Sequence, residues 1–153
     1  MGNRRVVDRW VEALEADDLA AQRALLHDEF VGRYPQSGEV IRGPDNRIAI
    51  VAGYPDWDRT SGPVKVETIT GTDDQFVSAP SGIGWSIVHL SGSDDEFTIT
   101  GAVRYPDGSV WHVVGLLIVR DGKIWRETSY FAEPFEAADW RAQYVEREQP
   151  QAT

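Results

Sequence analysis

The stretch VVDRWVEALEADDLAAQRALLHDEFVGRYPQSGEVIRG, residues 6–43, decides the fold. Its first part carries apolar residues at helical spacing, namely Val6, Val7, Trp10, Val11 and Leu14. This spacing predicts an amphipathic helix, and Asp18 can cap a second short helix that ends near His27. Residues 30–41 then read as extended chain, interrupted by Pro35. The block therefore predicts two short helices followed by a strand.

Beyond this block the pattern changes from helices to strands. A third helix is predicted from Pro44 to Ala52, and residues 56–62 and 76–84 read as loops. Strands are predicted from alternating or mostly apolar runs at residues 64–70, 85–90, 97–105, 110–119 and 124–132. The Asp-Gly pairs at residues 107–108 and 121–122 are typical of hairpins, so the last three strands form an antiparallel meander. Helices followed by strands favour an α+β fold.

The C-terminal end predicts one more helix and a tail. Residues 139–148 place Trp140 and Tyr144 four positions apart, on one helical face. Residues 149–153 are expected to be disordered. No linker or internal repeat divides the chain, so residues 1–148 are expected to form a single domain.

Composition and charge exclude several classes of protein. The chain has 153 residues, a formal net charge of −10 and no cysteine. A nucleic-acid-binding protein would need a basic stripe, which this sequence lacks, and binding to an anionic membrane is disfavoured for the same reason. No apolar run approaches the ~20 residues of a transmembrane helix. Charged residues interrupt the N-terminal segment where a signal peptide would lie, so a cytoplasmic protein is expected.

Three segments carry a family resemblance: VVDRWVEALEADDL (residues 6–19), ALLHDEFVGRYP (24–35) and GKIWRETSYF (122–131). They resemble the start and the closing strand of SnoaL-like proteins of the nuclear-transport-factor-2-like superfamily, which includes the ketosteroid isomerases. The resemblance covers most of the chain. It implies a cone-shaped α+β barrel, with three N-terminal helices packed on a strongly bent antiparallel sheet. It also implies one deep cavity and a homodimer formed through the outer sheet face.

Two known active sites of this superfamily are missing from the sequence. In the ketosteroid isomerases, the tyrosine that donates to the oxyanion falls here on Trp10 and the general-base aspartate falls on Tyr34. A phenol with a pKa near ~10 is a poor base at neutral pH. The closing-strand aspartate of the epoxide hydrolases falls on Ser129. The resemblance therefore implies neither a ketosteroid isomerase nor an Arg-Asp-Asp epoxide hydrolase. Trp10 remains a candidate ligand contact through its indole N–H, with core packing as the alternative.

Strand alternation predicts which residues share a face of the meander. If both Asp-Gly pairs are two-residue hairpins, the cross-strand pairs include Leu116 with Glu127, Val114 with Ser129, His112 with Phe131 and Val103 with His112. The predicted inner face then consists of Ile99, Gly101, Val103, His112, Val114, Leu116, Glu127, Ser129 and Phe131. Such a face, mostly apolar with a few polar groups, is typical of a ligand pocket.

Glu127 and His112 are the candidate catalytic residues. A carboxylate on an apolar cavity wall can act as a general acid or base, because desolvation raises its pKa. The alternative for Glu127 is an ion pair with a nearby arginine. His112 titrates in the useful range, and its alternative is a structural histidine of the wall.

The remaining candidates are ligand contacts. Tyr34 and Gln36 are expected at the cavity mouth as hydrogen-bonding groups. Trp57, in the loop after the predicted third helix, is expected as an aromatic residue at the cavity rim. Ser129 and Phe131 belong to the predicted inner face, and His89 joins them if its strand turns that side inward. No spacing of metal ligands and no phosphate-binding loop is present, so no metal and no cofactor are expected.

Three functions remain open from the sequence. The first is a cofactor-independent isomerase, cyclase or dehydratase that uses acid–base chemistry on a small apolar metabolite. The second is a non-catalytic protein that binds such a molecule in the same pocket. The third is a dimerisation module whose cavity is filled by its own aromatic side chains. A homodimer is expected because the outer face, with Trp111, Val113 and Tyr130, exposes apolar surface.

Overall fold

The computed structural model describes residues 2–59, 66–69, 77–80 and 82–147. The elements in chain order are α1 (Asn3–Glu15), α2 (Leu19–Leu25), β1 (Leu26–Tyr34), β2 (Glu39–Arg42), α3 (Pro44–Ala52), β3 (Val66–Ile69), β4 (Val77–Pro80), β5 (Gly84–Ser93), β6 (Glu96–Arg104), β7 (Val110–Arg120), β8 (Lys123–Ala132) and the 3-10 helix η1 (Asp139–Tyr144).

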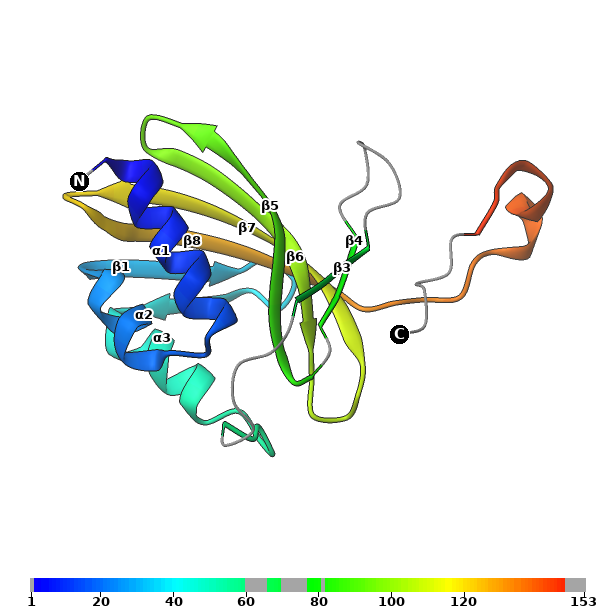
Figure 1. The fold of residues 1–153 in the computed structure, drawn as a ribbon, viewed down its shortest axis with the longest axis horizontal. Coiled ribbons are helices and arrows are strands. Elements are labelled where there is room, and N and C mark those ends of the chain that lie inside the picture. Colours follow the sequence, from blue (N-terminus) through cyan, green and yellow to red (C-terminus); the bar gives the residue numbers. More distant parts are fainter. Residues whose placement is uncertain (1, 60–65, 70–76, 81, 148–153) are drawn as a thin grey trace.

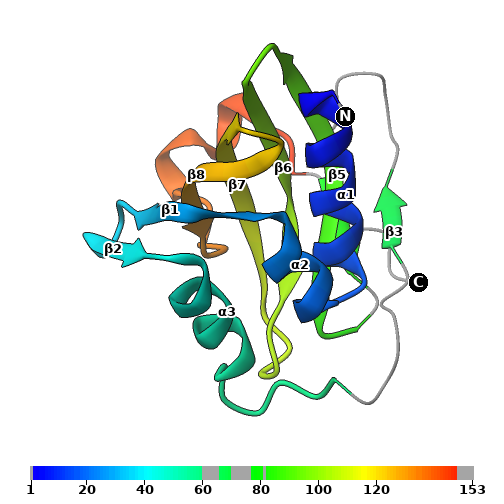
Figure 2. The ribbon, with the colours of Figure 1, turned by 90° about the vertical axis from the view of Figure 1, so that its left-hand side faces the viewer.

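Two described strands, β3 and β4, form a separate antiparallel pair, and the other six form one curved sheet. Its strand order is β2-β1-β8-β7-β6-β5, and every neighbouring pair is antiparallel except β1 and β8, which are parallel. The N-terminal helices pack on one side of this unclosed sheet (Figures 1 and 2). The prediction of an α+β fold with N-terminal helices on a strongly bent sheet is confirmed.

The turn between α1 and α2 follows from two adjacent aspartates. Asp17 adopts a left-handed backbone with φ of 50°, which ends α1 sharply. Asp18 then caps α2, since its Oδ1 accepts a hydrogen bond from the backbone N–H of Ala21 at 2.9 Å. Helix α2 ends at Leu25, because Leu26 is already extended and begins β1. The predicted end near His27 was therefore slightly too late.

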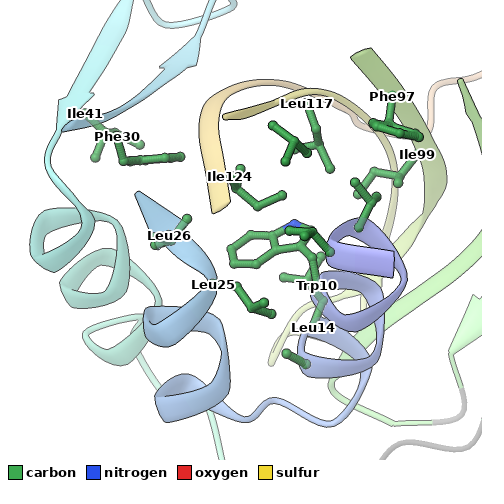
Figure 3. Close-up of a cluster of buried hydrophobic side chains, with 14 residues drawn as sticks. Trp10, Leu14, Leu25, Leu26, Phe30, Ile41, Phe97, Ile99, Leu117 and Ile124 are labelled. Atoms are coloured by element: carbon green, nitrogen blue, oxygen red, sulfur yellow. The ribbon is translucent and has the colours of Figure 1, made fainter. Parts of the chain in front are cut away.

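The core lies between the helices and the sheet (Figure 3). Trp10 is fully buried there, in contact with a cluster that spans α1, α2 and the strands. The cluster comprises Val6, Val7, Trp10, Ala13, Leu14, Leu25, Leu26, Phe30, Ile41, Phe97, Ile99, Leu117, Val119 and Ile124. The apolar stripe predicted for the first helix therefore faces the sheet, and Trp10 is a core residue.

Two segments differ from their predicted structure. Residues 77–80 form strand β4, where a loop was predicted, and β5 begins at Gly84. The predicted C-terminal helix is only the six-residue 3-10 helix η1, on a segment that leads away from the sheet (Figure 1). Trp140 and Tyr144 are 74% and 75% exposed there. A helical apolar face without a surface to pack on contributes little stability, which explains the failed prediction. The predicted tail lies outside the described residues.

The predicted register of the last three strands is wrong by one residue. The Arg120–Lys123 pair is as predicted, but a bulge at Trp125 moves the partners, so Glu127 pairs with Leu117 and Ser129 with Gly115. Trp125 is held between two guanidinium groups, with the Cζ atoms of Arg120 and Arg126 3.4 and 3.6 Å from its ring centroid.

The other hairpin has a three-residue loop instead of the two residues assumed. The backbone N–H of Tyr105 donates to the Ser109 carbonyl, and Gly108 takes the left-handed conformation with φ of 86°. His112 therefore pairs with Ala102 and not with Val103. As a result, the three side chains of β7 that were predicted to face inward are exposed: His112, Val114 and Leu116. Its buried positions are Val113, Gly115, Leu117 and Val119.

Among the described helices, none is long and apolar enough to span a membrane.

Candidate functional site

A cavity of about 310 Å³ lies at one end of the curved sheet, beside α3. The β1–β2 connection, α3 and the segment that follows it, and the ends of β5 to β8 contribute its walls. Its lining residues are Tyr34, Gln36, Ser37, Glu39, Arg47, Ile50, Val51, Tyr54, Trp57, Trp85, Tyr105, Trp111 and Phe131. More than half of these residues are aromatic, so the walls are flat, rigid and largely apolar.

The aromatic side chains form two connected groups. Tyr105 is the centre of the first: it stacks on Tyr54, with ring centroids 5.2 Å apart and an interplanar angle of 20°, and meets Trp111 edge to face at 5.4 Å. Phe131 is the centre of the second, with Tyr34 at 5.5 Å and Trp85 at 6.1 Å. These contacts hold the rings in place before any ligand arrives, which lowers the entropic cost of binding.

A buried ion pair connects the cavity to the sheet. Arg47 of α3 donates from Nε to Oε1 of Glu127 at 2.7 Å and from Nη2 to Oε2 at 3.4 Å. Both side chains are 4% exposed. Burial lowers the pKa of Arg47, but the charge and hydrogen bonds of Glu127 outweigh that effect and raise the pKa above its ordinary value. The guanidinium therefore stays charged, and the pair as a whole is neutral.

Three tyrosine hydroxyl groups of the cavity wall are neutral hydrogen-bonding groups. Burial raises the pKa of Tyr34, Tyr54 and Tyr105, most strongly for Tyr105. Arg47 opposes this effect at Tyr34, which places the two groups within electrostatic range of each other. Phenols with raised pKa values remain protonated and can donate hydrogen bonds to a ligand oxygen.

Two tethers fix the segments around the cavity. Trp57 donates from its indole N–H to Oδ2 of Asp17 at 3.0 Å, and Arg59 pairs with the same oxygen at 3.0 Å. The segment after α3 is thus fastened to the α1–α2 turn. Gln36 accepts a hydrogen bond from the backbone N–H of Phe131, which joins the β1–β2 connection to the end of β8.

The structure brings four of the sequence-derived ligand contacts to the cavity wall: Tyr34, Gln36, Trp57 and Phe131. Three others lie elsewhere. Trp10 is in the core, Ser129 is buried on β8 opposite Gly115 of β7, and His89 lies on β5 next to α1. A bulge between Ile87 and His89 changes the alternation of β5 at this point.

The two candidate catalytic residues are separated. Glu127 faces inward as predicted, but it makes the ion pair that was its alternative interpretation. His112 lies on the opposite face of the sheet, because the three-residue hairpin loop and the bulge at Trp125 shift the register. They therefore cannot act together on one ligand in this arrangement.

The sequence analysis missed Arg47, Trp85, Tyr105 and Trp111 as lining residues. A signal for Arg47 was available: residues three and four apart on a helix share a face, and Arg47, Ile50 and Val51 all line the cavity. Trp111 was assigned to the outer face by the register error. Within the described part of the chain, no group of three or more His, Cys, Asp or Glu side chains could hold a metal ion.

Comparisons with known proteins agree with the geometry. Residues 7–127 match the family model described as a SnoaL-like domain. No curated protein matches the sequence.

Solved structures show the same fold. An NTF-2 like protein of unknown function from Burkholderia xenovorans LB400 is 26% identical, with a TM-score of 0.68 over 95% of this chain and 94% of the other. A candidate ketosteroid isomerase from Kribbella flavida DSM 17836 is 18% identical, with a TM-score of 0.71 over 97% and 91%. An LEH-like epoxide hydrolase of M. tuberculosis is 21% identical, with a TM-score of 0.54 over 83% and 80%.

Proposed function

The chain belongs to the SnoaL-like domain family, and we propose that it binds a small, largely apolar molecule in the aromatic cavity. The observation that carries this proposal is the cavity itself: about 310 Å³ of space with aromatic walls and few polar groups. Ligand sites typically begin at about this volume and have this composition. A dimerisation module with a filled interior would have no such space beside α3.

A catalytic role is the second candidate, and the polar groups of the wall favour it. An isomerase, cyclase or dehydratase without a cofactor needs hydrogen-bond donors where negative charge develops. Tyr34 and Arg47 supply such donors, and Glu127 holds Arg47 in place. A binding protein would show no turnover of its ligand, whereas an enzyme would lose turnover in Tyr34→Phe with little change in binding.

The binding proposal is tested by NMR of the tryptophan side chains. Trp57, Trp85 and Trp111 line the cavity, whereas Trp125 lies between two arginines and Trp140 is exposed on η1. Titration with indane, a compact apolar molecule, is expected to shift the indole N–H signals of the three tryptophans that line the cavity. The signals of Trp125 and Trp140 should stay unchanged. Equal shifts at all sites, or none, would contradict binding in the cavity.

A matched pair of variants provides the control. Val51→Trp places a large ring in the cavity and is expected to abolish indane binding, because Val51 lines the wall. Val145→Trp makes the same exchange at a position that is 46% exposed and outside the cavity, and it should leave binding unchanged.

We also propose a homodimer formed through the outer face of the sheet. The support is an exposed apolar group on two neighbouring strands: Val114, Leu116 and Tyr130 are 37%, 43% and 42% exposed. Val114 and Tyr130 are cross-strand partners, so the group is continuous. A symmetric dimer would cover the same patch on both copies.

A further inference from the structure

The buried guanidinium of Arg47 has one end that Glu127 does not use. Glu127 accepts from Nε and Nη2, so the carboxylate occupies one edge of the planar fork. The third nitrogen, Nη1, is buried and has no hydrogen-bond partner among the described residues. An unpaired buried donor is costly, and native proteins retain such groups mainly where a ligand or a water molecule can satisfy them. Arg47 is one of the residues that line the cavity, so a ligand in the cavity lies next to its side chain.

Glu127 determines which kind of ligand atom can accept a hydrogen bond from Nη1 of Arg47. A carboxylate placed at Nη1 would be attracted by Arg47 and repelled by Glu127 across the guanidinium. Because the pair is already neutral, the remaining attraction is small, while removing a carboxylate from water is expensive. A neutral carbonyl oxygen loses much less hydration and still accepts a hydrogen bond from a charged donor.

The groups around Arg47 also disfavour a carboxylate ligand. The ring of Trp10 lies on its core side, with its centroid 5.6 Å from the Arg47 Cζ, and offers no positive charge. Tyr34 is a neutral phenol on the cavity side. Glu39, also in the lining, adds a second carboxylate that disfavours an anionic ligand. Among the described residues that line the cavity, Arg47 is the sole basic one, and its charge is balanced by Glu127.

We propose that Glu127 is a specificity-determining residue: by neutralising Arg47, it makes the cavity select a neutral carbonyl ligand, bound at Arg47 Nη1, and reject carboxylates. This inference rests on the proposed binding function and adds the chemical class of the ligand. Glu127 acts here through Arg47 and is a positioning residue, which does not itself touch the ligand.

The test uses three ligands of one shape: indane, 1-indanone and indane-1-carboxylate. Their dissociation constants are measured by calorimetry for the wild type, for Glu127→Gln, and for Arg47→Met combined with Glu127→Leu. The wild type is expected to bind the ketone at least about tenfold more tightly than the carboxylate. In the double variant, the preference for ketone over hydrocarbon should fall about tenfold, because one charge-assisted hydrogen bond is lost.

Glu127→Gln keeps the shape of the side chain but leaves Arg47 with an unbalanced charge. The preference for ketone over carboxylate is therefore expected to fall at least about tenfold, or to reverse. Should this variant fail to fold, the wild-type selectivity and the double variant decide the question. An unchanged ketone-to-hydrocarbon ratio in the double variant, or a wild type that prefers the carboxylate, would overturn the inference while leaving cavity binding intact. If the wild type binds none of the three molecules, the proposed function itself is wrong.

Discussion

Removing Arg47 alone should cost far more stability than removing a comparable surface arginine. In Arg47→Met, the carboxylate of Glu127 would remain 4% exposed without its partner. Breaking a buried pair in this way costs about 3–5 kcal/mol. For a chain of this size, that corresponds to a fall in melting temperature of about 6–20 °C. Arg23→Met is the matched control, because Arg23 also pairs with a carboxylate at 2.7 Å, but Asp45 is 87% exposed. That exchange should cost at most about 1 kcal/mol.

The double variant separates the charge effect from the loss of packing. Arg47→Met combined with Glu127→Leu replaces both ions by apolar side chains of similar size, which is often neutral or stabilising. We expect its free energy of unfolding, measured by urea denaturation, to lie within about 1 kcal/mol of the wild type or above it. If Arg47→Met is as mild as Arg23→Met, or if the double variant is as unstable as the single one, the buried charge is not what makes Arg47 important.

Three further predictions concern the sheet, the tyrosines and the dimer. Gly101→Ala would place a Cβ atom 2.0 Å from the carbonyl oxygen of Ser86, so we expect the free energy of unfolding, measured by urea denaturation, to fall by about 3 kcal/mol or more. Gly82→Ala is the control and should be nearly neutral, because no atom lies within 4 Å of the added Cβ. Burial raises the pKa of Tyr105 above its ordinary value of 10.0, so the unfolded chain loses this proton first and stability should fall as pH rises above about 10. Tyr105→Phe should reduce that fall in denaturation curves between about pH 9 and 11, and an identical fall would contradict the assignment. Leu116→Lys should sediment as a monomer at micromolar concentration where the wild type sediments as a dimer; a monomeric wild type would refute the proposed outer-face contact.

The sequence correctly predicted the helices and strands that are determined by residues close together in the chain. The apolar spacing around Trp10 and the capping residue Asp18 predicted α1 and α2, and the two Asp-Gly pairs predicted the meander. These features depend on neighbours within a few positions, and the tertiary structure reinforces them. The C-terminal helix failed because its apolar pair, Trp140 and Tyr144, has nothing to pack against among the described residues.

The candidate site was harder to predict because it depends on register. A single extra residue, Trp125, reverses which side chains of β7 face inward, since alternation has a period of two. Nothing in a window around Asp121-Gly122 reveals that Trp125 will be held between Arg120 and Arg126. The same error placed His112 on the same face as Glu127 and Trp111 on the outer face. The mostly apolar face predicted for the meander indicated a ligand pocket, but the residues that line the cavity could be identified only from the fold.

The corrected register changes the chemistry that this cavity can perform. With His112 on the outer face and Glu127 paired to Arg47, neither predicted group is available as a proton acceptor near the ligand. What the wall offers are donors: the phenols of Tyr34 and Tyr105, and Arg47. Donors of this kind orient a carbonyl oxygen and stabilise negative charge that develops on it, as in an oxyanion hole. A reaction in this cavity would therefore depend on electrostatic stabilisation of the ligand oxygen, with any proton acceptor supplied by the ligand, by water or by the exposed carboxylate of Glu39. A protein that only binds its ligand would use the same donors for selectivity.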